Sequence, residues 1–504
     1  RISYAVMRGS DCITWIEIAM ASGITDFTEG ERARPQIGLP SMIRLGLFNT
    51  GIAMMSLLTL GVLNRVMIDE LQVPALVAAG SIAMYQFMSP ARIWFGQLSD
   101  NKPLLGHYRS GYIWLGTAGM GLMAFLAVQV MWQLGAQMEI GGWGPSAYPW
   151  AGLLAVVFSL YGLALAATTP FTALLVDVSD EKTKSKIVGV GWSMLMVGII
   201  AGVFLINSLL GPVDQDLALD SLRAPINRVF VVVPLVVLAM AFVSTAGVEK
   251  RFSRRGKRSA AAEREDGITL SKALKVLTAS RQTGLFFCFL LVLSLSLFTQ
   301  NPVLEPYGGQ IFGMSLTETN MLNAFFGVGT LVGLLMTGFV LMPLLGKKTT
   351  VKAGCVAASI FLVGLAAGGW TGQPMLLNAA VGCFGLASGV LTTGSIVLMI
   401  DLTAAEAAGT FIGAWGLAQA TAQGGASLLG GALLTLGKQL TGAAAVEKAL
   451  AVPTTGQLLP AYGLVFVVQA VGMLVAIALV SRVDIQSFQT DAKQAIAAVL
   501  ENEG

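Results

Sequence analysis

Candidates for acid–base or nucleophilic chemistry are few in this 504-residue chain, which contains a single histidine, His107. That residue lies in GQLSDNKPLLGHYR (96–109), a polar run between two long apolar segments. If the long apolar segments cross a membrane, no Ser/His/Asp, Cys/His or paired-carboxylate set has its members at a comparable depth in that membrane. Such catalysis requires its residues to lie close together. The four cysteines, Cys12, Cys288, Cys355 and Cys383, are too scattered for a disulfide framework or a metal site. We therefore expect no catalytic residues, no protein metal site and no enzymatic activity.

Amide and aromatic side chains instead recur at helical spacing inside the apolar segments. Trp415, Gln419 and Gln423 follow one another at four-residue steps, which places them on one face of a helix. Such groups either form hydrogen bonds between membrane helices or line a cavity that accepts a large, mostly apolar ligand. The candidate ligand-binding residues are Asn49, Gln86, Asn323, Trp415, Gln419 and Gln423.

The elements that must position these residues are transmembrane helices. Hydrophobic residues make up 55% of the chain and charged residues 12%, whereas soluble domains carry about 25% charged residues. Apolar runs of the roughly 20 residues that cross a bilayer recur throughout. We predict an all-α polytopic membrane protein with twelve helices, near 43–64, 74–98, 111–135, 149–175, 186–210, 227–247, 283–301, 319–345, 351–370, 376–400, 408–436 and 459–481.

The placement of lysine and arginine orients these helices. With the N-terminus inside, the inside loops carry 18 basic residues and the opposite loops 5. Because basic residues near helix ends stay cytoplasmic, both termini are predicted to be cytoplasmic. The predicted parts are an N-terminal segment (1–42), a six-helix half (43–247), a basic linker (248–282), a second six-helix half (283–482) and an amphipathic tail (483–504).

The two halves resemble copies of each other. Thr168, Thr169, Asp177 and Gly189 match Thr392, Thr393, Asp401 and Gly413, each 224 residues later. A parallel repeat of six-helix halves is typical of the major facilitator architecture, in which a central cavity lies between the halves. Glycine-rich stretches such as GVGTLVGLLMTG (327–338) are interpreted as faces of close helix packing.

Charged residues are predicted to lie only at helix ends and in loops. Asp69, Glu70 and Glu305 are assigned there, and Arg92 is the deepest basic residue. Ion-coupled transporters usually bury a titratable group as a proton or ion site. The predicted absence of such a group counts against a proton-driven symporter but leaves facilitated movement of an apolar solute open.

Several stretches resemble a known family. GQLSD (96–100) resembles the major facilitator loop motif G-x-L-[AS]-D. More narrowly, four stretches resemble the PucC-like branch of that superfamily, which is associated with (bacterio)chlorophyll delivery. Their sequences are more similar to those of its cyanobacterial members. These stretches are LGVLNRVMIDELQVPA (60–75), SPARIWFGQLSDNKPLLGHYRSGYIW (89–114), LLVDVSDEKTKSKIVGVGWSMLMVG (174–198) and LMIDLTAAEAAGTFIGAWGLAQA (398–420), and the resemblance runs from about residue 40 into the tail.

The resemblance implies a factor that assembles light-harvesting or photosystem complexes by binding chlorophyll or bacteriochlorophyll as cargo. Its partners would be the subunits of those complexes and membrane lipids, not nucleic acid. Its location would be the thylakoid or inner membrane of a phototrophic bacterium. Two alternatives stay open: a secondary transporter of a small amphipathic solute, and a scaffold that binds no pigment. The pigment magnesium would take Gln, Asn, a backbone carbonyl or water as ligand, with Gln86, Gln419, Gln423 and Asn323 as the side-chain candidates.

Loop-motif residues are assigned structural roles. Gly96 is predicted to permit close helix packing. Asp100 is predicted to pair with Lys102 or Arg109, or to face the positive N-terminal dipole of the helix near 408–436, which is the preferred alternative. Asp177, Asp180 and Asp401 complete this set, and His107 is expected to be a surface residue beside the turn. The usual basic residue directly after the motif aspartate is replaced by Asn101.

Overall fold

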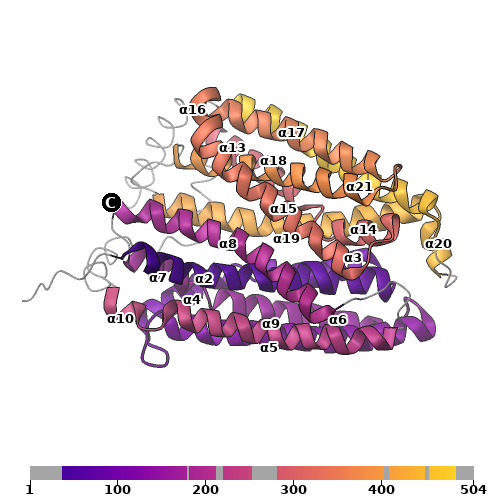
Figure 1. The fold of residues 1–504 in the computed structure, drawn as a ribbon, viewed down its shortest axis with the longest axis horizontal. Helices are drawn as coiled ribbons and strands as arrows, with labels where there is room; N and C mark the ends of the chain where they lie inside the picture. The colour runs from indigo at the N-terminus through magenta and orange to yellow at the C-terminus, as the bar shows by residue number, and fades with distance from the viewer. Residues whose placement is uncertain are drawn as a thin grey trace, which may run out of the picture.

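A bundle of long, roughly parallel helices makes up almost all of the computed structural model (Figure 1). It describes residues 37–178, 181–211, 219–252, 281–401, 408–448 and 453–483. Within these ranges, nine helices are long and apolar enough to cross a membrane, and Ala75–Phe87 and Gly284–Phe298 are shorter apolar helices. The chain is therefore an integral membrane protein. The count of twelve spans and the side on which the termini lie stay predictions.

The first half of the chain occupies one side of the bundle. Its helices are α2 (Leu39–Ser56), η1 (Leu57–Leu63), η2 (Val66–Glu70), α3 (Ala75–Phe87), α4 (Ala91–Asn101), α5 (Ser110–Gly141), α6 (Tyr148–Ala166), α7 (Pro170–Val178), α8 (Glu181–Leu210), α9 (Leu219–Thr245) and α10 (Val248–Phe252). The segments α2, η1 and η2 form one continuous span, in which η1 and η2 have π-helical hydrogen bonding.

The second half lies above the first in Figure 1. Its helices are α13 (Arg281–Phe298), α14 (Leu304–Phe312), α15 (Leu316–Met336), η3 (Thr337–Leu341), α16 (Met342–Leu345), α17 (Lys347–Gly368), α18 (Pro374–Asp401), α19 (Ala408–Leu440), α20 (Ala443–Lys448) and α21 (Thr455–Arg482). Pro302 lies in the break between α13 and α14, where proline, which lacks an N–H, cannot continue a helical ladder.

Two predicted helix boundaries were wrong in a way that matters for function. The first span continues past residue 64 to Glu70 and includes Arg65 and Asp69. The seventh resumes after its break as α14, whose first turn carries Glu305. Glu305 lies in the first turn of α14, at a helix end as predicted, whereas Arg65 lies inside the first span. Both residues are 3% exposed, so the predicted absence of a buried titratable group was wrong. Among the described residues, Arg65 is the most buried basic residue, whereas Arg92 is only half-buried.

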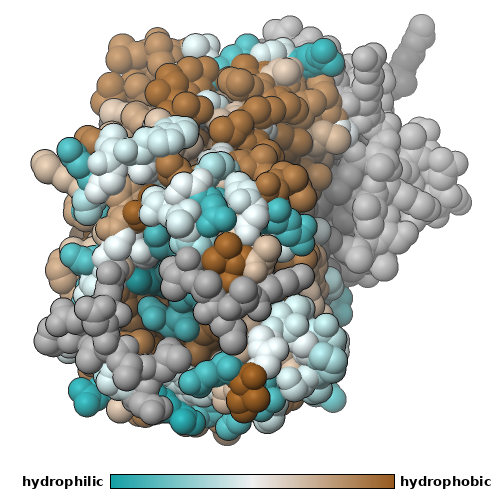
Figure 2. All heavy atoms as spheres, turned by 90° about the vertical axis from the view of Figure 1, so that its right-hand side faces the viewer, coloured by the Kyte–Doolittle hydropathy of each residue, from teal (hydrophilic) through white to brown (hydrophobic). Residues whose placement is uncertain are grey.

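The two ends of the bundle differ in how the halves meet. One end, on the right in Figure 1, carries α20, and the other carries α4 and α10. The first is called the Asp69 end, because Asp69 interacts electrostatically with Lys438, the ion-pair partner of Glu447 in α20. The second is called the Asp100 end after Asp100 in α4. In the described part of the chain, hydrogen bonds between the halves lie at the Asp69 end and in the middle, from Leu76 N to Thr435 Oγ1 (3.2 Å) as far as Gln86 Nε2 to Gln423 Oε1 (3.1 Å). The halves are thus joined at the Asp69 end. Figure 2 looks onto this end, where hydrophilic residues are plentiful, whereas the upper flank is largely apolar.

Helices α15 and α18 pack closely along facing glycines, which agrees with the packing role predicted for residues 327–338. A Cβ added to Gly333 would overlap the carbonyl of Leu386, and one added to Gly389 would overlap the carbonyl of Thr330. Only glycine lets the two backbones approach this closely.

We expect Gly333→Ala to lower the free energy of unfolding by about 1–3 kcal/mol, because the added methyl group forces α15 away from α18. Gly364→Ala in α17 is the matched control, since a Cβ there meets nothing within 4 Å. That control should be neutral, or more stable by less than about 1 kcal/mol, because alanine is the better helix former. Thermal unfolding in detergent micelles measures both variants, and equal shifts would show that the close packing is unimportant.

Candidate functional site

A cavity lies between the two halves, in the middle of the bundle. It is partly open, and its volume is about 180 Å³. Its wall is mostly apolar and comes from α2, η1, α8, α14 and α15, with residues such as Leu60, Ile199 and Phe326. The polar side chains in the wall are Ser56, Gln300, Asn301, Glu305 and Asn323. The site is therefore an apolar chamber with one carboxyl group.

Glu305 is held against the cavity wall by two neighbours. Its Oε1 accepts a hydrogen bond from Asn323 Nδ2 at 2.5 Å. Its Oε2 is buried and has no hydrogen-bond partner. On the facing helix, a Cβ on Gly61 would overlap the carboxyl group, so the glycine makes room for it. One carboxyl oxygen is thus positioned and the other is unused.

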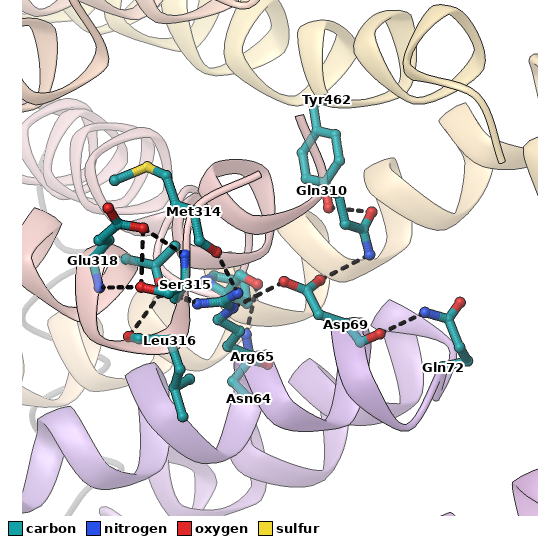
Figure 3. Close-up of polar contacts among 12 residues, drawn as sticks. Asn64, Arg65, Asp69, Gln72, Gln310, Met314, Ser315, Leu316, Glu318 and Tyr462 are labelled. Carbon is teal, nitrogen blue, oxygen red and sulfur yellow. Dashed lines mark hydrogen bonds and ion pairs between the residues drawn. The ribbon is translucent and has the colours of Figure 1, made fainter. Parts of the chain in front are cut away.

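Arg65 follows Gly61 of the cavity wall by four residues and makes the polar contacts drawn in Figure 3. Its Nε forms an ion pair with Asp69 Oδ2 at 3.0 Å. Its guanidinium also donates to the carbonyls of Met314 (2.8 Å) and Ser315 (2.7 Å), and to Thr319 Oγ1. Since Arg65 belongs to the first half and its three acceptors to the second, one buried side chain joins the halves.

Asp69 extends the same network to α14 and α21. Its Oδ1 accepts a hydrogen bond from Gln310 Nε2 at 2.8 Å, and Gln310 Oε1 accepts one from Tyr462 Oη at 2.8 Å. Asn64 Nδ2 donates to the carbonyl of Pro302 at 2.7 Å. Figure 3 shows these side chains converging from the two halves. We call Asn64, Arg65, Asp69, Gln310 and Tyr462, with their acceptors on 314–319, the Arg65 cluster.

The structure separates the predicted ligand-binding residues. Gln86 and Gln423 bind each other across the halves, and Asn49 Nδ2 donates to the carbonyl of Gly191 between α2 and α8 at 3.1 Å. These three amides therefore follow the interhelical alternative. Gln419 lines a separate cavity of about 30 Å³. Asn323 alone of the described candidates lines the central cavity, and the side chain of Trp415 lies outside the described residues.

Sequence reasoning missed Glu305 and the Arg65 cluster. A signal was present: Arg65 and Asp69 stand four residues apart, as an ion pair on one helix face does, within an otherwise apolar run. Glu305 likewise stands alone in an apolar context three residues before a Gly-Gly pair. Both were assigned to helix ends and loops because a charged residue ends an apolar run.

At the Asp100 end, Arg109 organises the loop motif. Its Nη2 pairs with Asp100 Oδ1 at 2.6 Å, its Nε with Asp177 Oδ2 at 3.1 Å, and its Nη1 donates to Ser99 Oγ at 2.7 Å. Of the partners considered for Asp100, the structure shows Arg109. Arg109 thereby joins α4 to α7 within the first half.

The other described loop-motif residues are not part of the wall of the central cavity. A Cβ on Gly96 would contact nothing within 4 Å, so the close-packing role predicted for it was wrong. Lys102 is exposed, and Gly106 has φ +73°, as the expected turn requires. His107 Nδ1 lies 2.9 Å from the carbonyl of Leu105 at the surface. Asp180 and the side chain of Asp401 lie outside the described residues.

The fold defines a class of membrane protein. The bacterial homologue of the human lysosomal transporter Spinster, in its inward-facing and occupied conformation, superimposes with a TM-score of 0.63 at 13% identity, over 88% of this chain and 97% of that one. The peptide transporter POT (E310Q mutant) gives 0.58 at 13% identity, over 89% and 97%. The chain thus has the fold of major facilitator transporters.

The family is narrower than the fold. The model of the PUCC protein family matches residues 62–488, and the chain belongs to that family. Protein PucC of Rhodobacter capsulatus is 29% identical over 463 residues, 88% of this chain and 92% of the relative. A Rhodobacter capsulatus protein named bacteriochlorophyll synthase 44.5 kDa chain is 28% identical over 450 residues, 87% and 94%. Protein PucC of Rhodovulum sulfidophilum is 28% identical over 415 residues, 80% and 86%.

Proposed function

We propose that this protein binds chlorophyll or bacteriochlorophyll in its central cavity and hands it to subunits of light-harvesting or photosystem complexes, without catalysing a reaction. Membership of the PUCC protein family and the name of one relative support a link to pigment complexes. The observation that carries the proposal is the mostly apolar cavity between the halves. We further propose twelve spans, both termini in the cytoplasm, and residence in a photosynthetic membrane.

The size of the cavity limits how a pigment can enter. Pockets for drug-sized ligands measure about 300–1,000 Å³. At about 180 Å³ the cavity lies below that range and is too small for a whole chlorin ring. The ring would therefore use the open side of the cavity, and the phytyl chain would extend into lipid. Loading and release need no chemistry, only access to that side.

The absorption spectrum of the protein purified from a phototroph tests this proposal. Delivery predicts about one pigment per chain. A pigment-free protein that still co-purifies with antenna subunits would contradict it and favour the scaffold alternative.

Filling the cavity gives a sharper prediction. Leu60→Trp places an indole in the wall of the cavity, and we expect it to remove most of the co-purified pigment. Leu235→Trp is the matched control, because Leu235 is 60% exposed on the side of the bundle. Retention of pigment by Leu60→Trp, at the level of Leu235→Trp, would show that the pigment binds elsewhere.

A secondary transporter of a small amphipathic solute is the second candidate, and Glu305 favours it. A buried acidic side chain in the cavity is the feature that the sequence-based prediction lacked, and such groups mark transport pathways in membranes. In proteoliposomes, a co-transported solute would carry protons inward and acidify the lumen. Vesicles with Glu305→Gln would then stay neutral, whereas pure delivery predicts no acidification in either.

A further inference from the structure

Glu305 has the chemistry that the magnesium of a chlorophyll requires. Mg²⁺ prefers hard oxygen ligands such as carboxylates and carbonyls. Glu305 lines the cavity, is 3% exposed, and has one oxygen without a partner. Of the amides first considered as ligands, Gln86 and Gln423 bind each other and are not part of the cavity wall, and Asn323 positions Glu305 through its Nδ2.

The surroundings of Glu305 fix its orientation. Asn323 holds Oε1, and Gly61 leaves room for the carboxyl group against η1. Neighbours that hold one side of a metal ligand orient it and tune its affinity. The oxygen left over is Oε2, and the apolar side chains of Leu60 and Phe326 lie in the same wall. A flat, apolar ligand with one electron-accepting centre matches an apolar wall that carries a single unpartnered carboxyl oxygen.

In the described part of the chain, Glu305 has no ionic partner that would compete with such a ligand. Arg65 is the nearby buried cation, but its ion pair is with Asp69, and among the described residues no ion pair with Glu305 is present. The ring of a magnesium tetrapyrrole already neutralises its metal, so a coordinate bond to magnesium, rather than a net opposite charge, would stabilise the buried carboxylate.

We propose that Glu305 is the axial ligand of the pigment magnesium, held in place by Asn323 and Gly61. This inference rests on the proposed delivery function. The protein would then recognise the metal centre of a magnesium tetrapyrrole and not the ring alone.

A comparison of chlorophyll a with pheophytin a, its metal-free counterpart, tests the proposal. The full chain in lipid nanodiscs is titrated with each pigment, and binding is followed by quenching of tryptophan fluorescence. The unmodified protein should bind chlorophyll about tenfold or more tightly than pheophytin, the scale expected when a metal site loses an important contact. Glu305→Leu should weaken chlorophyll binding to the level of pheophytin and leave pheophytin binding unchanged.

Two further variants complete the experiment. Glu305→His supplies another magnesium ligand and should restore the preference, with altered coordination-sensitive Raman bands of the macrocycle. Glu318→Gln is the matched control: Glu318 is an exposed residue of the same half, and glutamine preserves its capping box with Ser315. It should bind both pigments as the unmodified protein does.

The outcomes separate the two proposals. If Glu305→Leu binds both pigments with the original preference, Glu305 is not the ligand and delivery still stands. If the unmodified protein binds neither pigment, the delivery function itself is wrong. Retained pheophytin binding by Glu305→Leu also shows that this variant is folded.

Discussion

Replacing Arg65 with methionine is expected to lower the free energy of unfolding by about 3–5 kcal/mol, the usual cost of breaking a buried ion pair from one side. The side chains of Arg65 and Asp69 are 3% and 8% exposed, so water cannot compensate the aspartate left behind. The same change removes the donors to Met314, Ser315 and Thr319 in the second half. Denaturant unfolding in detergent micelles measures the loss.

The double variant Arg65→Met/Asp69→Leu distinguishes a buried charge pair from simple packing. With both charges gone, neither is left unpaired, so the double variant should be more stable than the sum of the single changes. Additive losses would contradict the coupling. Arg44→Met is the control for arginine loss on the same span, since Arg44 is exposed and bonds only backbone carbonyls among the described residues. It should cost about 1 kcal/mol.

The membrane class of the protein could be predicted because it depends on local composition. Long apolar runs with few charges have no stable alternative to membrane helices. The glycine stretch at 327–338 was likewise predicted to pack closely, and Gly333 does so against α18. Each of these properties belongs to a single segment of chain.

The charged site could not be predicted in the same way, because its partners are remote in sequence. Arg65 is tolerated inside the membrane because carbonyls about 250 residues later accept hydrogen bonds from its guanidinium. Glu305 likewise lies against Gly61, on the opposite half. An apolar pattern ends at the first charge, so the first helix was predicted to stop at residue 64.

The roles of the amide side chains also could not be predicted from the sequence. Hydrogen bonding between helices and lining of a cavity were both consistent with their spacing. The structure shows the first for Gln86 with Gln423, and the second for Asn323. Which alternative holds depends on the helix faces that meet, and a single sequence with helical periodicity does not specify those.

Arg109 at the Asp100 end is expected to be as important to stability as Arg65, but within one half. Arg109→Met should lower the free energy of unfolding by about 3–5 kcal/mol, because Asp177 is left without its ion pair in a buried position. The side chains of Arg109 and Asp177 are 7% and 6% exposed. Arg109→Lys should recover little, since an ammonium group cannot match the planar fork that binds Asp100, Asp177 and Ser99 together.

Asp100→Asn tests whether burial, rather than the loop motif itself, sets the size of these effects. Asp100 pairs with the same arginine as Asp177, but its side chain is 56% exposed. Its ion pair is therefore screened by water, and we expect Asp100→Asn to cost at most about 1 kcal/mol. Unfolding in detergent micelles compares it with Asp177→Asn, which should cost clearly more. Equal losses would mean that Asp100 has a second role, such as the helix-dipole contact considered for it. A larger cost for Asp177→Asn than for Asp100→Asn would show that Arg109 is a buried structural residue with one important and one minor partner. Equal costs would instead show that every charge of the loop motif contributes alike.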